Sequence, residues 1–308
     1  MSGLEPTSLL ILSLITVFSY CFYIKVFRRL SQTEREEGLR SHKKKNGTIT
    51  MGGIMFIILP LFFIPYVKEV ILIVIAVVGF GLIGFVDDLL IIKYKKNDGL
   101  SARFKLIIEI FLSGLIFYYY LSLEKNTIVD LYFFKFELKW IFGLFILWLL
   151  TASCNAWNLL DGVDVLCSGC SSLIFIGLMI IACKKNEIFI FWTLLVFGIV
   201  VFIFWCFNLP KAFLFMGDVG SLALGALLAI TSIYLNCLVS FIVMAGLFIF
   251  DTFSVILQVF FYKKTKKRLF KMAPFHHHLE MSGFSEIKVD LLFYFIQIIL
   301  VIIGVLLS

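Results

Sequence analysis

The chain has 308 residues, of which 61% are hydrophobic and only 15% are charged. A soluble domain has roughly 45–50% apolar and about 25% charged residues, so this composition excludes a mainly soluble protein and predicts a polytopic membrane protein. The net charge is +7, from 27 basic and 20 acidic residues. In a membrane protein such an excess reports on which side the loops lie, so we expect no nucleic-acid partner.

Ten apolar runs are candidates for membrane-spanning helices, which need about 20 mostly apolar residues each. The second and eighth are short or interrupted by glycine. Residues 126–139 alternate apolar and polar side chains, which predicts a short external β-hairpin. With no signal peptide, repeat or linker evident, we expect one all-α membrane domain over residues 1–308. The ten runs lie near 8–27, 51–67, 70–86, 104–123, 140–157, 165–183, 188–206, 221–236, 238–262 and 289–307.

The distribution of basic residues predicts the orientation. Placing the N-terminus outside puts 21 of the 27 Lys and Arg residues in five inner segments. Basic residues concentrate in cytoplasmic loops, so this split predicts that both termini lie outside.

Polar residues gather on the predicted inner side. A charge at membrane depth costs several kcal/mol unless it is paired or hydrated. Five acids at one face therefore indicate a metal site, a proton path or a basic substrate. The acids are Asp87, Asp88, Asp161, Asp164 and Asp218. On the same side lie Lys45, Lys105, Asn155, Asn158, Asn208, His276, His277 and His278.

Two acidic motifs stand at predicted inner helix ends. Asp87 and Asp88 are adjacent and point about 100° apart on a helix, so one could bind a metal or act as a base while the other pairs with Lys or forms a cap. Asn155, Asn158, Asp161 and Asp164 are each three residues apart. A straight helix would turn the first and last to opposite sides, whereas a break at the intervening glycine would let them converge.

Three further segments carry polar groups suited to phosphate or metal. Asp218 stands between glycines, in a turn that suits a metal ligand or a phosphate. Residues 43–53 combine Lys45 and Thr50 with glycines before a predicted span, as in a phosphate site or a membrane anchor. Residues 271–280 hold three consecutive histidines, whose diverging side chains fit substrate contacts as well as zinc.

Other polar residues have structural interpretations. Cys167 and Cys170 form a C-x-x-C pair, but they open an apolar helix and are expected to be packing residues. Glu109 and Asp251 lie within predicted spans, where they could bond neighbouring helices or face a lipid-substrate groove. We assign them no catalytic role.

Many carboxylates, amides and cations without a clear nucleophile favour Mg²⁺-assisted phosphoryl transfer at the membrane surface. An ion-coupled transporter would instead place its acids near the bilayer midplane. A structural scaffold would need none of them.

Seven motifs, in order between about residues 40 and 286, resemble those of the polyprenyl-phosphate N-acetylhexosamine-1-phosphate transferases. Within that superfamily they most resemble the bacterial phospho-N-acetylmuramoyl-pentapeptide transferases. The motifs are KNGTITMGG, GFVDD, GLSARFK, NAWNLLDGVD, FMGDVGSLALG, DTFSVILQV and PFHHHLE.

The resemblance implies ten transmembrane helices and a cytoplasmic site in the bacterial plasma membrane. It implies transfer of phospho-N-acetylmuramoyl-pentapeptide from UDP to undecaprenyl phosphate, yielding lipid I and UMP, with Mg²⁺ as cofactor. The expected partners are therefore a UDP-sugar donor, the undecaprenyl phosphate acceptor and membrane lipids. The oligomeric state stays open, a homodimer included.

The resemblance also implies residue roles. Asp218 resembles the metal ligand. Asp87, with Asp88 beside it, resembles the acid that deprotonates or orients the lipid phosphate, and Lys105 resembles a phosphate-facing cation. His276 and His277 resemble residues near the sugar-phosphate. The expected substrate-binding set is completed by Lys45, Thr50, Asn155, Asn158, Asp161, Asp164, Asn208, Phe215, which resembles the residue that stacks on uracil, and His278.

Some residues depart from the family pattern. Ile49, Leu160, Val165 and Cys167 stand where Pro, Thr, Gly and Ala are usual, and Asp251 stands where Glu is more usual. These changes affect loop stiffness and the shape of the nucleotide pocket. They leave the N-acetylglucosamine-1-phosphate transferases as the alternative branch, and an ion-coupled transporter as a more distant one.

Overall fold

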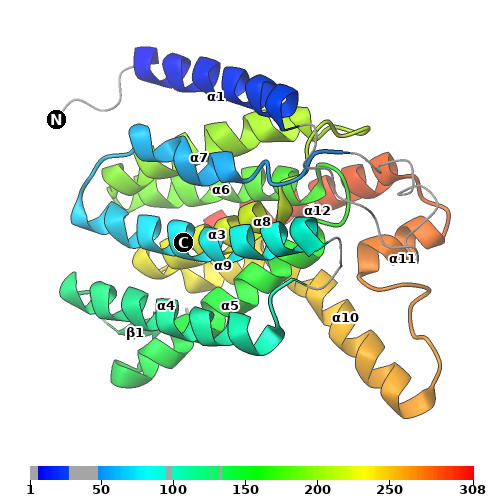
Figure 1. Ribbon diagram of the computed structural model, residues 1–308. Helices are drawn as coiled ribbons and strands as arrows, with labels where there is room; N and C mark the ends of the chain where they lie inside the picture. Colours follow the sequence, from blue (N-terminus) through cyan, green and yellow to red (C-terminus); the bar gives the residue numbers. More distant parts are fainter. Residues whose placement is uncertain (1–5, 28–47, 95–98, 126, 132–133) are drawn as a thin grey trace.

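The computed structural model describes residues 6–27, 48–94, 99–125, 127–131 and 134–308. These residues form a bundle of α-helices with one small sheet (Figure 1). The helices are α1 (Pro6–Val26), α2 (Ile54–Ile58), α3 (Lys68–Tyr94), α4 (Ala102–Ser122), α5 (Phe142–Leu160), α6 (Leu166–Lys184), α7 (Ile188–Phe207), α8 (Gly217–Tyr234), α9 (Leu238–Met244), α10 (Gly246–Thr265), α11 (Phe275–Met281) and α12 (Glu286–Leu306), with 3₁₀ turns η2 (Pro60–Phe62) and η3 (Lys139–Ile141).

Nine helices in the described part of the chain are long and apolar enough to cross a membrane. The prediction of an all-α polytopic membrane protein is therefore confirmed. Helices of 18–27 residues match the roughly 30 Å thickness of the hydrocarbon core at 1.5 Å rise per residue. Their outward faces carry large apolar side chains, such as Phe18, Phe111 and Phe295, as lipid contact requires.

Helix α8 lies at the centre of the bundle, with α3, α5 and α6 packed around it (Figure 1). Every residue from Val219 to Tyr234 is buried. Small residues allow this close packing: a Cβ at Gly225 would stand 2.7 Å from Cα of Cys154 on α5. The run near 221–236, weak on sequence grounds, is thus the core of the bundle.

Two predicted spans are not single helices. The run near 51–67 contains only the five residues of α2 and the turn η2. Pro60 lacks an N–H and prevents α2 from continuing. The run near 238–262 is divided into α9 and α10 at Ala245, and α10 projects from the bundle (orange, Figure 1).

The predicted hairpin is present as β1 (Ile128–Asp130) and β2 (Lys135–Glu137). The strands are antiparallel, with Val129 opposite Phe136. An ion pair of 3.0 Å joins Lys135 Nζ to Asp130 Oδ2 and links the strands.

Candidate active site

Four helix ends bring the central polar residues together. Asp87 lies near the C-terminal end of α3, Lys105 in the first turn of α4, Asn158 near the end of α5 and Asp218 at the start of α8. Lys105 Nζ stands 4.0 Å from Asp87 Oδ2 and 3.7 Å from Asp218 Oδ2. One cation therefore faces two carboxylates that are 131 residues apart in sequence.

The two neighbouring aspartates of α3 have different partners. Asp87 Oδ1 accepts a 2.5 Å hydrogen bond from the Leu100 N–H, which ties α3 to the segment before α4. Asp88 is buried, and its two carboxylate oxygens accept hydrogen bonds of 3.1 Å from the N–H groups of Asp218 and Val219. Asp88 thus caps the N-terminus of α8, where backbone donors lack helical partners.

Glycines allow α8 to begin at this point. Gly217 has φ of +72°, and a side chain there would collide with the Asp88 carboxylate. Gly84 on α3 lies directly against the Asp218 carbonyl, so α3 approaches α8 closely enough for Asp88 to reach its N-terminus.

The Asp218 side chain is oriented by α5. Asn158 Nδ2 donates to Asp218 Oδ1 at 2.6 Å and to Ser221 Oγ at 3.2 Å. Asn155 does not join this group, because its exposed side chain bonds the Thr151 carbonyl of its own helix at 2.8 Å. A step of three residues turns a regular helix by about 300°, so the Asn155 side chain points about 60° away from that of Asn158, and the convergence considered for the whole motif does not include Asn155.

The loop after α5 adds two acids. Asp161 is half-buried at the end of α5, and burial followed by the nearby carboxylates of Asp218, Asp88 and Asp164 raises its pKa well above the ordinary value. Asp164 is buried, and its Oδ2 lies 3.5 Å from the Ala212 N–H. This end of the bundle therefore carries a concentration of carboxyl groups, whose mutual repulsion favours the neutral form of Asp161.

Asn208 joins two loops of the site. Its Oδ1 accepts a 2.6 Å hydrogen bond from the Val165 N–H, and its Nδ2 donates to the Leu214 carbonyl at 2.8 Å. Both ends of the amide are thus committed to backbone. Asn208 holds the loop after α5 against the segment that leads to Asp218.

Phe215 and Thr50 lie on adjoining strands of chain. The Phe215 N–H donates to the Ile49 carbonyl, and the Gly52 N–H donates to the Phe215 carbonyl, both at 2.8 Å. The Phe215 ring is half-buried. Thr50 is buried, and its Oγ1 has no hydrogen-bond partner among the described residues. Lys45 lies outside the described residues.

The three histidines stand on α11 and have three different environments. His276 Nδ1 lies 2.8 Å from Asp251 Oδ2, and His277 Nδ1 lies 2.7 Å from Glu280 Oε2. His278 Nδ1 accepts a 3.1 Å hydrogen bond from the Lys271 N–H, and its ring packs against Phe275. The structure brings the first two to the loop after α5, since a Cβ at Gly162 would meet both Nε2 atoms, at 3.0 Å and 3.3 Å.

Sequence reasoning missed three partners of these side chains. Ser221 stands one turn after Asp218 and bonds Asn158, which helical periodicity could have indicated. Glu280 stands three residues after His277 and was equally within reach. Asp251, which we considered as a bond between helices but assigned no catalytic role, is the partner of His276, 25 residues later in the chain.

The carboxylates at these helix ends can hold a cation if further ligands complete its coordination. Asp87 and Asp218 present carboxylate oxygens to the same point, which is occupied by the Lys105 ammonium. Among the described residues, no three His, Cys, Asp or Glu side chains form a metal cage. Cys167 and Cys170 are buried free thiols within α6, as expected of packing residues.

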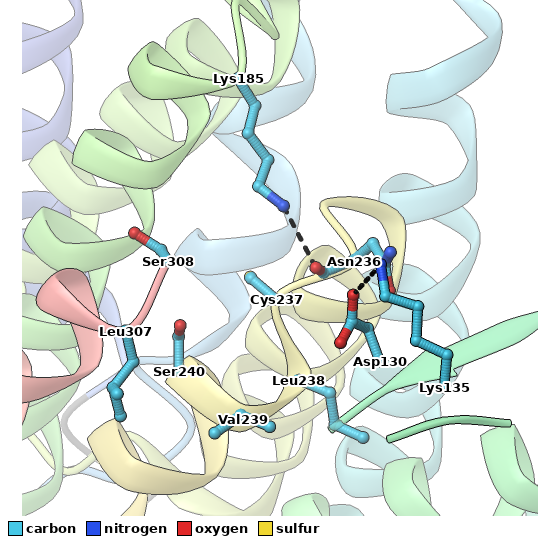
Figure 2. Close-up of a pocket in the computed structure, with 10 residues that line it drawn as sticks. All are labelled: Asp130, Lys135, Lys185, Asn236, Cys237, Leu238, Val239, Ser240, Leu307 and Ser308. Atoms are coloured by element: carbon cyan, nitrogen blue, oxygen red, sulfur yellow. Dashed lines mark hydrogen bonds and ion pairs between the residues drawn. The ribbon is translucent and has the colours of Figure 1, made fainter. Parts of the chain in front are cut away.

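A cavity of about 270 Å³ lies at the other end of α8 (Figure 2). Its two lysines are already paired: Lys185 Nζ donates to the Asn236 carbonyl at 3.1 Å, and Lys135 pairs with Asp130. Helix α8 is about 27 Å long at 1.5 Å per residue, so this cavity is remote from Asp218. None of the expected site residues lines it.

Residues 70–236 match the family model of glycosyl transferase family 4. This stretch is more than half of the chain, and it contains Asp87, Lys105, Asn158 and Asp218. The chain belongs to glycosyl transferase family 4.

Curated members of family 4 match this chain almost from end to end. Each of the following three is a phospho-N-acetylmuramoyl-pentapeptide-transferase. The one from Staphylococcus epidermidis is 37% identical over 307 residues, which cover 94% of this chain and 95% of the relative. The one from Bacillus subtilis is 35% identical over 306 residues, covering 95% and 94%. The one from Bacillus thuringiensis is 36% identical over 312 residues, covering 95% and 94%. This family 4 chain therefore belongs with these transferases.

Proposed function

We propose that this protein transfers phospho-N-acetylmuramoyl-pentapeptide from UDP to undecaprenyl phosphate, forming lipid I and UMP in peptidoglycan biosynthesis. The observation that carries the proposal is Lys105 between the carboxylates of Asp87 and Asp218, at 4.0 Å and 3.7 Å. Phosphoryl transfer depends mainly on positioning and charge neutralisation, and these groups can supply both. The names of the relatives, which state the transferred group, support this choice of donor.

The reaction exchanges one phosphorus–oxygen bond for another. An oxygen of the lipid phosphate bonds to the phosphorus on the sugar side of the UDP-sugar, and the bond from that phosphorus to the bridging oxygen breaks, so UMP leaves with the bridging oxygen. A phosphomonoester has its second pKa near about 6 and is largely ionised at pH 7, so no strong base is required. We therefore assign Asp87 to orienting the acceptor together with Lys105.

We further propose that the site uses Mg²⁺, with Asp218 as its protein ligand and Asp87 facing it. Mg²⁺ is commonly held by one or two carboxylates together with substrate phosphates, rather than by a protein cage. The carboxylates of Asp87 and Asp218 fit this mode of binding, because both face one point. When bound, the ion would neutralise charge on the diphosphate.

The donor would lie along the loops that lead from Asp218 to α11. In this proposal Phe215 stacks on uracil, while Lys45, Thr50, Asp161, Asp164 and Asn208 shape the nucleotide pocket. The unpartnered Thr50 hydroxyl is available for a substrate atom. His276 and His277 contact the sugar-phosphate. Asn155 and His278 lie at the edge of the site and make no direct contact with substrate in this proposal.

The site lies on the cytoplasmic side of the bacterial plasma membrane in this proposal. The support is the distribution of charge, with 21 of 27 basic residues in the segments on the side of the acids. A soluble nucleotide-sugar and a membrane-bound lipid phosphate can both reach such a site.

The test is UMP release by the full-length protein in detergent, with undecaprenyl phosphate and either UDP-N-acetylmuramoyl-pentapeptide or UDP-N-acetylglucosamine. We expect UMP from the first donor only, and only with Mg²⁺. UMP from the second donor alone would refute the muramoyl assignment and implicate Ile49, Leu160 and Val165. Release in the presence of EDTA would refute the Mg²⁺ proposal.

A further inference from the structure

Asp251 and His276 form a buried pair between α10 and α11. Both side chains are completely buried. The carboxylate accepts from His276 twice: Oδ2 lies 2.8 Å from the ring Nδ1, and Oδ1 accepts a 3.2 Å hydrogen bond from the His276 N–H. One carboxylate therefore fixes both the backbone and the ring of this residue, so the ring has a single orientation.

The opposite ring atom of His276 has no partner. Its Nε2 is buried and makes no hydrogen bond within the described residues. Leaving a buried polar nitrogen unpaired is unfavourable, so such an atom in a native protein needs an explanation, of which a catalytic role is one. With Nδ1 occupied by Asp251, Nε2 is the only ring atom free to meet a substrate.

The direction of Nε2 places it at the donor side of the site. A Cβ at Gly162 would stand 3.0 Å from this atom and 3.3 Å from Nε2 of His277. Gly162 lies between Asp161 and Asp164 in the loop after α5. The Nε2 atoms of the two imidazoles therefore converge on a loop that already belongs to the candidate active site.

We propose that Asp251 is a positioning residue, which fixes His276 so that Nε2 donates a hydrogen bond to an oxygen of the phosphate that is transferred. This inference rests on the function proposed above. A carboxylate on Nδ1 suits that task because it sets the ring orientation, and a ring with a proton on each nitrogen donates to Asp251 from Nδ1 and to the phosphate from Nε2.

A purely structural pair would not need to leave Nε2 buried without a hydrogen bond to the described residues. Asp251 lies in a membrane-spanning helix, where an unpaired carboxylate is unfavourable. An apolar pair of similar volume could join α10 to α11 without that cost. A positioned substrate contact accounts for both the acid and the histidine.

The experiment measures kcat/KM for the UDP-sugar donor in full-length protein with three variants: Asp251→Asn, His276→Asn and the double variant. Asn at position 276 can still donate to Asp251 from the place of Nδ1, but it lacks Nε2, so it tests the contact without unpairing the buried acid. Thr252→Val is the matched control, since Thr252 bonds only the Phe248 carbonyl of its own helix.

We expect each single variant to lose about 10- to 100-fold, the range seen when a residue that orients a histidine is removed. The double variant should be no slower than His276→Asn, because Asp251 acts only through that ring. The control should stay within about twofold. All proteins are compared by thermal unfolding, and Asp251→Glu replaces Asp251→Asn if the latter does not purify folded, with a smaller loss expected.

The outcomes separate the two proposals. A folded wild-type protein that releases no UMP with any donor overturns the proposed function. An active wild type with His276→Asn at full activity overturns the phosphate contact. Losses that multiply in the double variant would show that Asp251 acts independently of His276, which overturns its positioning role.

Discussion

At the residue scale, Asp87 and Asp88 are adjacent in sequence but have different environments. Asp87 faces Lys105, while Asp88 accepts from the first N–H groups of α8. The sequence predicted that one of the pair could bind a metal or act as a base while the other pairs with Lys or forms a cap, and the structure shows that Asp88 forms the cap. Both were expected in the active site, and Asp88 reaches it through the backbone of Asp218.

We predict different consequences for Asp88→Asn and Asp218→Asn. Asp88→Asn weakens the cap of the buried helix α8, so it should lower the free energy of unfolding by about 1–2 kcal/mol. Both the unfolding temperature and the rate of UMP release should fall. The second should leave the unfolding temperature near that of the wild type and reduce UMP release by at least about 100-fold. Full activity of Asp218→Asn would remove it from the proposed metal site.

Lys105→Gln tests the only described cation within 4 Å of these carboxylates. Removing a preorganised charge that faces the reacting phosphate costs about 10²–10³-fold in rate. Lys93→Gln is the control, because Lys93 is an exposed residue in the last turn of α3. UMP release should fall steeply in the first variant and stay unchanged in the second. Equal rates in both would assign Lys105 a structural role.

At the scale of elements, length and hydropathy predicted the helices well where an apolar run forms one uninterrupted helix. They failed for residues 51–67, because that run is apolar but is shaped by its glycines and Pro60. The Gly53 N–H donates to the Met216 carbonyl at 2.9 Å, and Gly53 itself lies against Gly220. The first residues of this apolar segment pack on the start of α8 and belong to the site, which hydropathy alone does not reveal.

The loop after α5 provides a prediction of its own. In Gly162→Ala, the added methyl group would press on the Nε2 atoms of His276 and His277, so we expect a loss of donor kcat/KM of at least about tenfold. Gly114→Ala is the matched control, since a Cβ there meets nothing within 4 Å. It should keep full activity and gain up to about 1 kcal/mol in stability. Equal activity of both variants would show that the loop does not need this close approach.

At the scale of the whole molecule, the acids lie at one end of α8 and the paired lysines of Figure 2 lie at the other. This polarity agrees with an enzyme that works at one membrane surface. It does not suit a transporter, which needs a site reachable from both sides.

We predict that reporter fusions will place the C-terminal ends of α10 and α12 on opposite sides of the membrane, as the distribution of basic residues indicates. A reporter after Ser308 should face outward, and one inserted between Thr265 and Lys271 should face the cytoplasm. Protease protection in sealed vesicles gives an independent reading. The reverse placement would refute the orientation proposed here, and both reporters on one side would show that α12 does not cross the membrane.

The sequence by itself determined the class of protein, the position of most helices, the hairpin and the identity of the polar residues. These properties depend mainly on local composition, because a continuous run of about 20 apolar residues without Gly or Pro satisfies its backbone in a membrane by forming a helix. Ordered motifs added the family, because their residue types and spacings are specific together.

Only the tertiary structure decided which polar groups meet. It joined Asp218 to Asn158 and Lys105, turned Asn155 outward, and gave His276 its partner Asp251. These contacts depend on how closely α3, α5 and α10 approach their neighbours, which small residues such as Gly84 and Gly225 allow. Helix packing is set by side chains far apart in sequence, so no local pattern contains it.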